Sequence, residues 1–114
     1  QKAVNPMDEE FIEKVNAFIQ NHFKDSQFQI TDLCREVNLS RSQLYRKTKA
    51  LLGENIGDYL QNKRLAHAEE LLQKSELSIS EIAYASGFSS PHYFATVFKQ
   101  KYNMSPSQFR TLDK

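Results

Sequence analysis

An internal repeat of about fifty residues constrains the fold of this chain more than any other feature. The segment from Ser78 to Tyr102 matches an earlier segment that begins at Ile30. The copies lie 49 residues apart up to the turn and 50 residues apart after it, because the later turn has one extra residue. The matched pairs are Ile30 with Ile79, Leu33 with Ile82, Cys34 with Ala83, Asn38 with Gly87, Ser40 with Ser90, Leu44 with Phe94, Thr48 with Phe98 and Leu52 with Tyr102. Such a period predicts two copies of one supersecondary unit.

Each copy has the local signals of a helix, a tight turn and a second helix. Ser78 and Glu81 form a capping box that predicts a helix start, and Gly87 tolerates the positive φ that the turn requires. Ser90 and Pro91 then fit the N-cap and the first position of the next helix. The first copy has Asn in place of the turn glycine, and Asn also accepts a left-handed conformation.

Four positions on the second helix of each copy are turned away from its apolar side. They recur at i, i+3, i+4 and i+7, and they are mostly small or polar with a lysine at the end. We call these sets the first outer face (Ser42, Tyr45, Arg46 and Lys49) and the second outer face (His92, Ala95, Thr96 and Lys99). Such faces are not core, so they are either solvated or available to a partner.

The rest of the chain also has the helical period. Asn5 and Pro6 predict a first helix that carries one apolar stripe and runs to about Phe23, and Asn55 predicts a long helix over 56–73. No alternating apolar pattern persists, so no strand is predicted and the fold class is all-α. The expected segments are a linker at 1–7, an N-terminal helix and loop at 8–27, a first helix-turn-helix at 28–54, a linker helix at 55–74, and a second helix-turn-helix with a C-terminal helix at 75–114.

The distribution of charge is more informative than the net charge of +1. Residues 1–34 carry three lysines against six acids, a net of −3, whereas residues 35–64 carry seven Lys or Arg against three acids, a net of +4. From residue 82 to 112 the only charges are Lys99, Lys101 and Arg110. Positive charge therefore gathers on the second helix of each repeat, which fits either a polyanion partner or a solvated helix surface.

Catalysis has little support in the residue pattern. The histidines are far apart in the sequence, no Cys or His pair has zinc-ligand spacing, and no glycine-rich phosphate loop or nucleophile elbow occurs. We therefore expect no enzyme activity, no catalytic residue, no metal and no cofactor. Cys34 is favoured as a small core residue over a reactive thiol. The single cysteine and the lack of an apolar membrane-spanning run or signal peptide favour the cytoplasm, without membrane contact.

Arg64 falls inside the apolar arc of the long helix. An unpaired charge in that position would be costly. The favoured interpretation is an ion pair with an acid such as Glu81, and the alternative is a contact with a DNA phosphate.

Three segments resemble the DNA-binding domain of the AraC-type (AraC/XylS) bacterial transcription regulators. They are ISEIAYASGFSSPHYFATVFKQKYNMSPSQFR, QITDLCREVNLSRSQLYRKTKALLG and RLAHAEELL, and the likeness covers roughly residues 28–110. The resemblance implies seven helices, with two helix-turn-helix subdomains joined by a long linker helix. It also implies sequence-specific DNA binding, in which two recognition helices enter successive major grooves of a promoter site.

The resemblance assigns roles by position. The base-reading residues are then Ser42, Tyr45, Arg46, Pro91, His92 and Thr96. The phosphate contacts are then Ser40, Arg41, Lys49, Ser90, Tyr93 and Lys99. Many relatives have Arg where this chain has Thr96, and a bidentate Arg to guanine is the commonest specific contact. We therefore expect the first motif to dominate direct readout.

The implied partners are double-stranded promoter DNA and RNA polymerase. The acidic first helix resembles those that join this domain to receiver domains in two-component response regulators and hybrid sensors, so an upstream receiver or sensor domain is expected. The residues also leave open a helical protein-interaction module whose outer faces dock a partner helix. Tyr45 and Tyr93 suit that module, whereas Arg46, Lys47 and Lys49, with no acid nearby, suit it less well.

Overall fold

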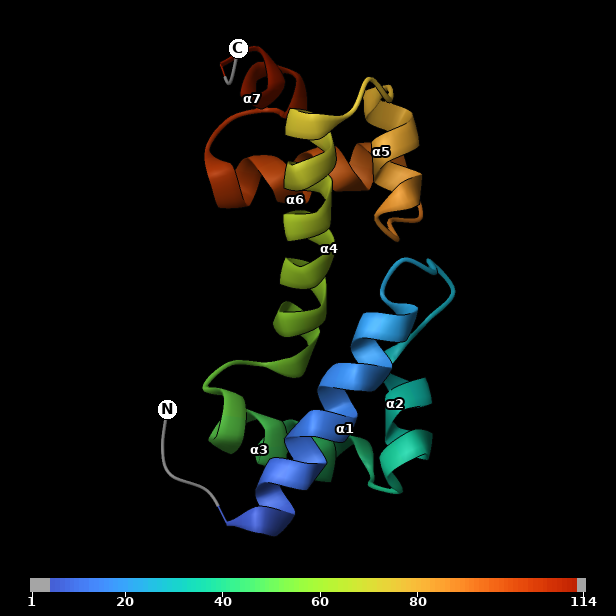
Figure 1. Cartoon of the computed structure of the whole chain (residues 1–114), viewed down its shortest axis with the longest axis vertical. Coiled ribbons are helices and arrows are strands. Elements are labelled where there is room, and N and C mark those ends of the chain that lie inside the picture. The colour runs from blue at the N-terminus through green and yellow to red at the C-terminus, as the bar shows by residue number, and fades with distance from the viewer. Residues whose placement is uncertain (1–4, 113–114) are drawn as a thin grey trace. The chain divides into compact units, whose positions relative to one another are not determined.

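Seven helices and their connecting turns make up the computed structural model, which describes residues 5–112 (Figure 1). In chain order they are α1 (Pro6–His22), α2 (Ile30–Val37), α3 (Arg41–Leu52), α4 (Ile56–Lys74), α5 (Ile79–Ala85), α6 (Pro91–Tyr102) and α7 (Pro106–Leu112). No strand occurs among these described residues. The predicted all-α class and the seven helices are confirmed. The expected linker end at 1–4, and residues 113–114, lie outside the described range.

Serine residues cap the start of four helices. Ser40, Ser78, Ser90 and Ser105 each accept a hydrogen bond from the backbone N–H three residues on, at 3.1–3.2 Å. In three of these caps the serine N–H also donates to the side chain of that third residue, which completes a capping box. Each cap satisfies an N–H that the helix leaves unpaired, which is worth about 1 kcal/mol.

The turn of each helix pair contains one residue in the left-handed region. Asn38 has φ 57° after α2, and Gly87 has φ 93° after α5. The N–H of the next residue then reaches back to a carbonyl of the preceding helix, from Leu39 to Cys34 at 3.1 Å and from Phe88 to Ala83 at 3.0 Å. The two turns are therefore built alike, as the repeat predicts.

The chain divides into two units, and each unit contains one of the helix pairs. The first unit comprises residues 5–22 and 28–61, and the second comprises residues 23–27 and 62–112. Each unit has its own buried core, and the repeated positions lie in those cores. Leu33 and Leu44 are fully buried in the first unit, and their counterparts Ile82 and Phe94 are fully buried in the second.

The first unit is built on α1, which packs against α2 and α3. Val15 and Ile19 of α1 are fully buried, as is Ile56 at the start of α4. Thr48 is also fully buried, and its hydroxyl donates to the Leu44 carbonyl at 2.7 Å. Among the described residues, Thr48 is the only buried polar side chain of the first unit, and this bond satisfies it.

Aromatic side chains dominate the core of the second unit. Phe94 stacks with Phe88 and Phe98 at ring separations of 5.1 and 5.6 Å, and Phe98 also meets Phe109 at 5.5 Å. Tyr102 packs beside Phe98 and donates its hydroxyl proton to Glu69 at 3.1 Å. Burial, together with this carboxylate, raises the pKa of Tyr102 to about 12. The inward-facing side of α6 is therefore fixed by rings from the turn and from α7.

The residue that follows the first helix packs differently from the sequence prediction. The helical period places Phe23 on the apolar stripe, but α1 ends one residue earlier at His22, whose Nδ1 lies 2.7 Å from the Phe18 carbonyl. Phe23 is 5% exposed and packs edge-on against His67 of the second unit, with 5.5 Å between ring centres. Residues 23–27, which we call the 23–27 loop, thus belong to the second unit although α1 and α2 belong to the first.

A buried hydroxyl in the second unit leads to a stability prediction. Ser86 is fully buried, and its hydroxyl makes no hydrogen bond within the described residues. Because a desolvated hydroxyl without a partner costs about 1–3 kcal/mol, Ser86→Ala is expected to raise the free energy of unfolding by roughly 1 kcal/mol. Urea unfolding measures the change, and Ser78→Ala, which removes a helix cap, should lower the same quantity by about 1 kcal/mol. A Ser86→Ala variant less stable than the unchanged protein would contradict this expectation.

Candidate nucleic-acid interface

The first outer face lies on α3, opposite the buried side of that helix. Ser42, Arg46 and Lys49 are exposed, and Tyr45 is half-buried. Neither α3 nor α6 contains an acidic residue. The helix therefore presents donors and positive charge at consecutive turns, with no carboxylate on the same helix to neutralise them.

Tyr45 is oriented by contacts on both sides. The Arg41 guanidinium lies over its ring, 5.6 Å from the centre, and its hydroxyl lies beside Gly57 at the start of α4, where a Cβ atom would come within 3.6 Å of it. A cation over an aromatic face is attracted by the ring quadrupole. Tyr45 and Arg41 therefore form one polar and aromatic surface, together with Ser42 in an open hollow.

Lys47 is on α3 but is not part of the outer face. Its amino group lies over the Phe11 ring of α1, 4.4 Å from the ring centre. A second open hollow on α3 is lined by Leu39, Gln43, Arg46 and Lys47. Arg46 thus stands at the border between this hollow and the exposed side of the helix.

The second outer face lies on α6 and carries fewer positively charged side chains than the first. His92, Thr96 and Lys99 are exposed, and Ala95 is half-buried. The Thr96 hydroxyl donates to the His92 carbonyl at 3.1 Å. With its one proton used in that bond, the Thr96 oxygen can accept a hydrogen bond from a partner. Pro91 is half-buried at the first helical position, so it can offer only apolar contact.

The residues proposed for phosphate contact surround the starts and ends of these helices. Arg41, Lys49 and Lys99 are exposed. Tyr93 is 48% exposed and stacks obliquely on Phe88, 6.2 Å away. Ser40 and Ser90 use their oxygen atoms as N-caps, yet each hydroxyl proton is left to donate elsewhere.

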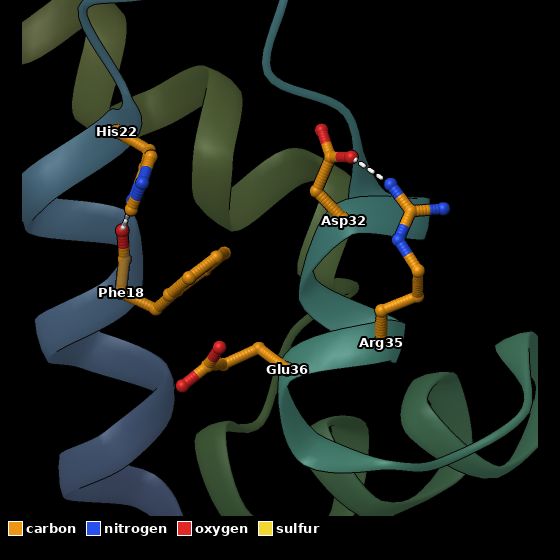
Figure 2. A pocket seen from close by; sticks show the side chains of 5 residues that line it. All are labelled: Phe18, His22, Asp32, Arg35 and Glu36. Carbon is orange, nitrogen blue, oxygen red and sulfur yellow. Dashed lines mark hydrogen bonds and ion pairs between the residues drawn. The ribbon is translucent and has the colours of Figure 1, made fainter.

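A further open hollow is found on the first unit. It lies between α1 and α2 and is lined by Phe18, His22, Asp32, Arg35 and Glu36. Figure 2 shows Asp32 paired with Arg35, while the Phe18 ring and the Glu36 carboxylate project into the space between the helices. Among the residues that the structure describes, no group of three or more potential ligands could hold a metal ion. Cys34 is a half-buried free thiol.

Comparison with known protein families shows to which family the chain belongs. Residues 33–111, more than half of the sequence, match the model of a helix-turn-helix domain family. The chain belongs to the AraC-type helix-turn-helix family. The assignment to DNA-binding domains of transcription regulators, which the sequence resemblance implied, is thereby confirmed. Within residues 5–112, no helix of this AraC-type domain is long and apolar enough to cross a membrane.

The relatives of this AraC-type domain are longer proteins. It is 36% identical to the HTH-type transcriptional activator RhaR of Salmonella dublin, over 91% of the chain and 36% of RhaR. It is 32% identical to histidine kinase P4 of Formosa agariphila, over 95% of the chain but 8% of that protein. The chain thus spans about a third or less of these relatives, and the name of the second does not assign kinase activity to it.

Solved structures share the fold of this AraC-type domain closely. The C-terminal domain of the two-component response regulator yesN from Fusobacterium nucleatum has a TM-score of 0.86 and 36% identity, covering 89% of this chain and 98% of that one. The DNA-binding domain of the transcriptional factor AdpA, solved in complex with a target DNA, has a TM-score of 0.83 and 28% identity, covering 88% and 89%. A two-component relative and a DNA-bound relative therefore share this architecture.

The sequence missed two features of the site. The contact between Arg41 and Tyr45 joins positions four apart on one helix, so the spacing alone could have indicated it. Arg64 was assigned either to an acid such as Glu81 or to DNA, whereas the structure shows it donating to the backbone carbonyls of Phe23 and Asp25. No side-chain pattern in the sequence signals a bond to a backbone group about 40 residues away.

The caps allow a test of the assigned phosphate contacts. Asp is as good an N-cap as Ser, so Ser40→Asp should keep α3 stable while placing a negative charge at the proposed phosphate position. DNA affinity, measured by fluorescence anisotropy, is expected to fall at least about tenfold, because two like charges in contact repel. Ser105→Asp is the matched control, since Ser105 has the same capping box with a glutamine and no assigned DNA contact. Equal affinities for the two variants would remove Ser40 from the interface.

Proposed function

We propose that this domain binds promoter DNA by placing α3 and α6 in successive major grooves on one side of the duplex. The observation that carries the proposal is the equivalence of the two outer faces, each exposed on the second helix of its pair and each ending in a lysine. The second helix of a helix-turn-helix presents its N-terminal residues to base edges. The AdpA domain, which has this architecture, has been solved with its target DNA.

The length of α4 is compatible with such a binding mode. The 19 residues of this helix correspond to about 28 Å at 1.5 Å per residue. Successive major-groove faces of B-DNA are about 34 Å apart. The remaining difference is small enough to be absorbed by bending the DNA, which costs of order 1–6 kcal/mol for bends of 40–90°.

Base discrimination is proposed to come mainly from α3. Ser42, Tyr45 and Arg46 offer a hydroxyl, an oriented aromatic ring and a guanidinium, and a guanidinium can donate two hydrogen bonds to one guanine. On α6 the candidates are Pro91, His92 and Thr96. Because the Thr96 hydroxyl donates within its own helix, the second motif contributes less discrimination than an arginine at that position would.

The proposed setting is a cytoplasmic two-component regulator. The yesN neighbour is the C-terminal domain of a two-component response regulator, which supports an upstream receiver or sensor domain in the full-length protein. RhaR is a transcriptional activator, which supports RNA polymerase as a further partner.

A mobility-shift titration with fragmented genomic DNA, carried out at two salt concentrations, tests DNA binding itself. The expected result is a shift whose affinity falls with salt, because Lys and Arg contacts to phosphates release counterions. A helical protein-interaction module would give no shift at either salt concentration. That result would contradict the proposal.

Arg46→Ala is expected to weaken binding to the preferred duplex by about 1–3 kcal/mol and to relax the preference at one base pair. The reason is that truncation removes the donors that a guanine edge would accept. Binding to a set of duplexes with each position varied in turn measures the effect. If affinity for every duplex falls by the same factor, Arg46 contacts only phosphates.

Lys49→Ala is expected to lower affinity equally for all sequences and to reduce the slope of log affinity against log salt by about one. The reason is the loss of one phosphate contact and of the counterion that it displaces. The matched control is Lys47→Ala, because the Lys47 amino group lies against Phe11 rather than on the outer face. An unchanged slope for Lys49→Ala would exclude Lys49 from the interface.

A further inference from the structure

Arg64 of α4 holds the 23–27 loop by two hydrogen bonds to backbone carbonyls. Its Nε donates to the Phe23 carbonyl at 2.7 Å, and one of its terminal nitrogens donates to the Asp25 carbonyl at 3.1 Å. Burial lowers the pKa of Arg64, and the nearby Asp25 carboxylate opposes that change. A guanidinium presents several donors in a fixed plane, so it can donate hydrogen bonds to two nearby carbonyls at once.

The same carbonyl lies against the turn of the second helix pair. A Cβ atom built on Gly87 would collide with the Phe23 carbonyl oxygen, and would lie 2.7 Å from Arg64 Nε and 3.1 Å from the Phe23 carbonyl carbon. Gly87 is therefore required for space as well as for its positive φ. Asn38, at the matching turn of the first pair, has the same left-handed conformation but is exposed.

This turn leads directly into the second outer face. Phe88 follows Gly87, is 2% exposed, and stacks on both Tyr93 and Phe94 at the start of α6. Ser90, the N-cap of α6, is two residues further along the chain. The order of contacts is thus Arg64, the 23–27 loop, Gly87, and the N-terminal turn of α6.

We propose that Arg64 is a positioning residue for DNA binding by the second motif, acting through the 23–27 loop and Gly87. This inference rests on the proposed function, because it concerns the affinity of α6 for DNA. It assigns Arg64 no contact with DNA, unlike the alternative of a phosphate contact. It also makes a segment that precedes the first helix pair part of the second motif, outside the matched family range of 33–111.

The experiment compares two variants and a control, each as the full chain. Arg64→Ala removes the donors, and Gly87→Asn keeps a residue that accepts positive φ while adding a Cβ against the Phe23 carbonyl. Asn38→Gly is the control, since it changes the matching turn of the first pair. The first measurement is ¹⁵N relaxation of the backbone in free protein. The second is affinity for a selected duplex and for versions with each half randomised in turn, over a range of salt.

Both test variants should lower the order parameters of residues 23–27 from about 0.85 to below 0.6. The affinity of both variants for the intact duplex should fall about tenfold. The preference for the selected sequence should be lost in one half of the duplex only, and the slope of log affinity against log salt should not change. Asn38→Gly should leave the 23–27 loop ordered. Folded variants whose loop stays ordered would overturn the proposal, as would a salt slope reduced by about one for Arg64→Ala. If the unchanged protein selects no duplex, the proposed function fails, while the relaxation measurement still decides whether Arg64 orders the loop.

Discussion

Each helix pair in this protein depends on a single residue that adopts a left-handed backbone conformation. For most L-amino acids that conformation costs about 1–2 kcal/mol. Asn and Gly adopt it more readily than other residues, and they occupy positions 38 and 87. The turn they form sends the chain from one helix into the next within three residues in the first pair and five in the second. It thereby decides which side of α3 and of α6 faces the core.

The exposed sides follow from that constraint. Leu44 and Thr48 on α3, and Phe94 and Phe98 on α6, are fully buried, so the residues opposite them must face solvent. What remains outside is a pair of equivalent surfaces with unequal chemistry. The first carries a guanidinium beside an oriented tyrosine, and the second carries a threonine whose hydroxyl donates within its own helix. We therefore expect the two motifs to differ in how strongly they discriminate between base pairs.

Most of the fold could be predicted from the sequence because its signals are local. The serine caps, the left-handed turn residues and the 3.6-residue period act over three or four positions, and the repeat supplied a second, independent copy of each. The sequence predicts the end of α1 to within one residue, but it misplaces Phe23, which packs against His67 rather than on the stripe of α1. A helical period cannot show that the last apolar residue of a stripe belongs to another core.

The candidate site was predicted less completely. The exposure of Ser42, Arg46, His92 and Thr96 followed from periodicity, but the roles of these residues came from the family resemblance and stay predictions. The contacts of Arg64 with the 23–27 loop could not be predicted, because the acceptors are backbone carbonyls, which every residue possesses. The sequence also contains no sign that a side chain at position 87 would collide with the Phe23 carbonyl, because the left-handed φ of the turn is by itself a sufficient reason for a glycine there.

The most direct test of two DNA-binding surfaces on one scaffold is selection of bound sites from random duplexes, followed by mapping of the major-groove contacts. Binding by both outer faces predicts two constrained segments whose centres lie about 10 base pairs apart, one helical turn of B-DNA, with the stronger constraint in one of them. A single constrained segment, or two segments on opposite sides of the duplex, would contradict it.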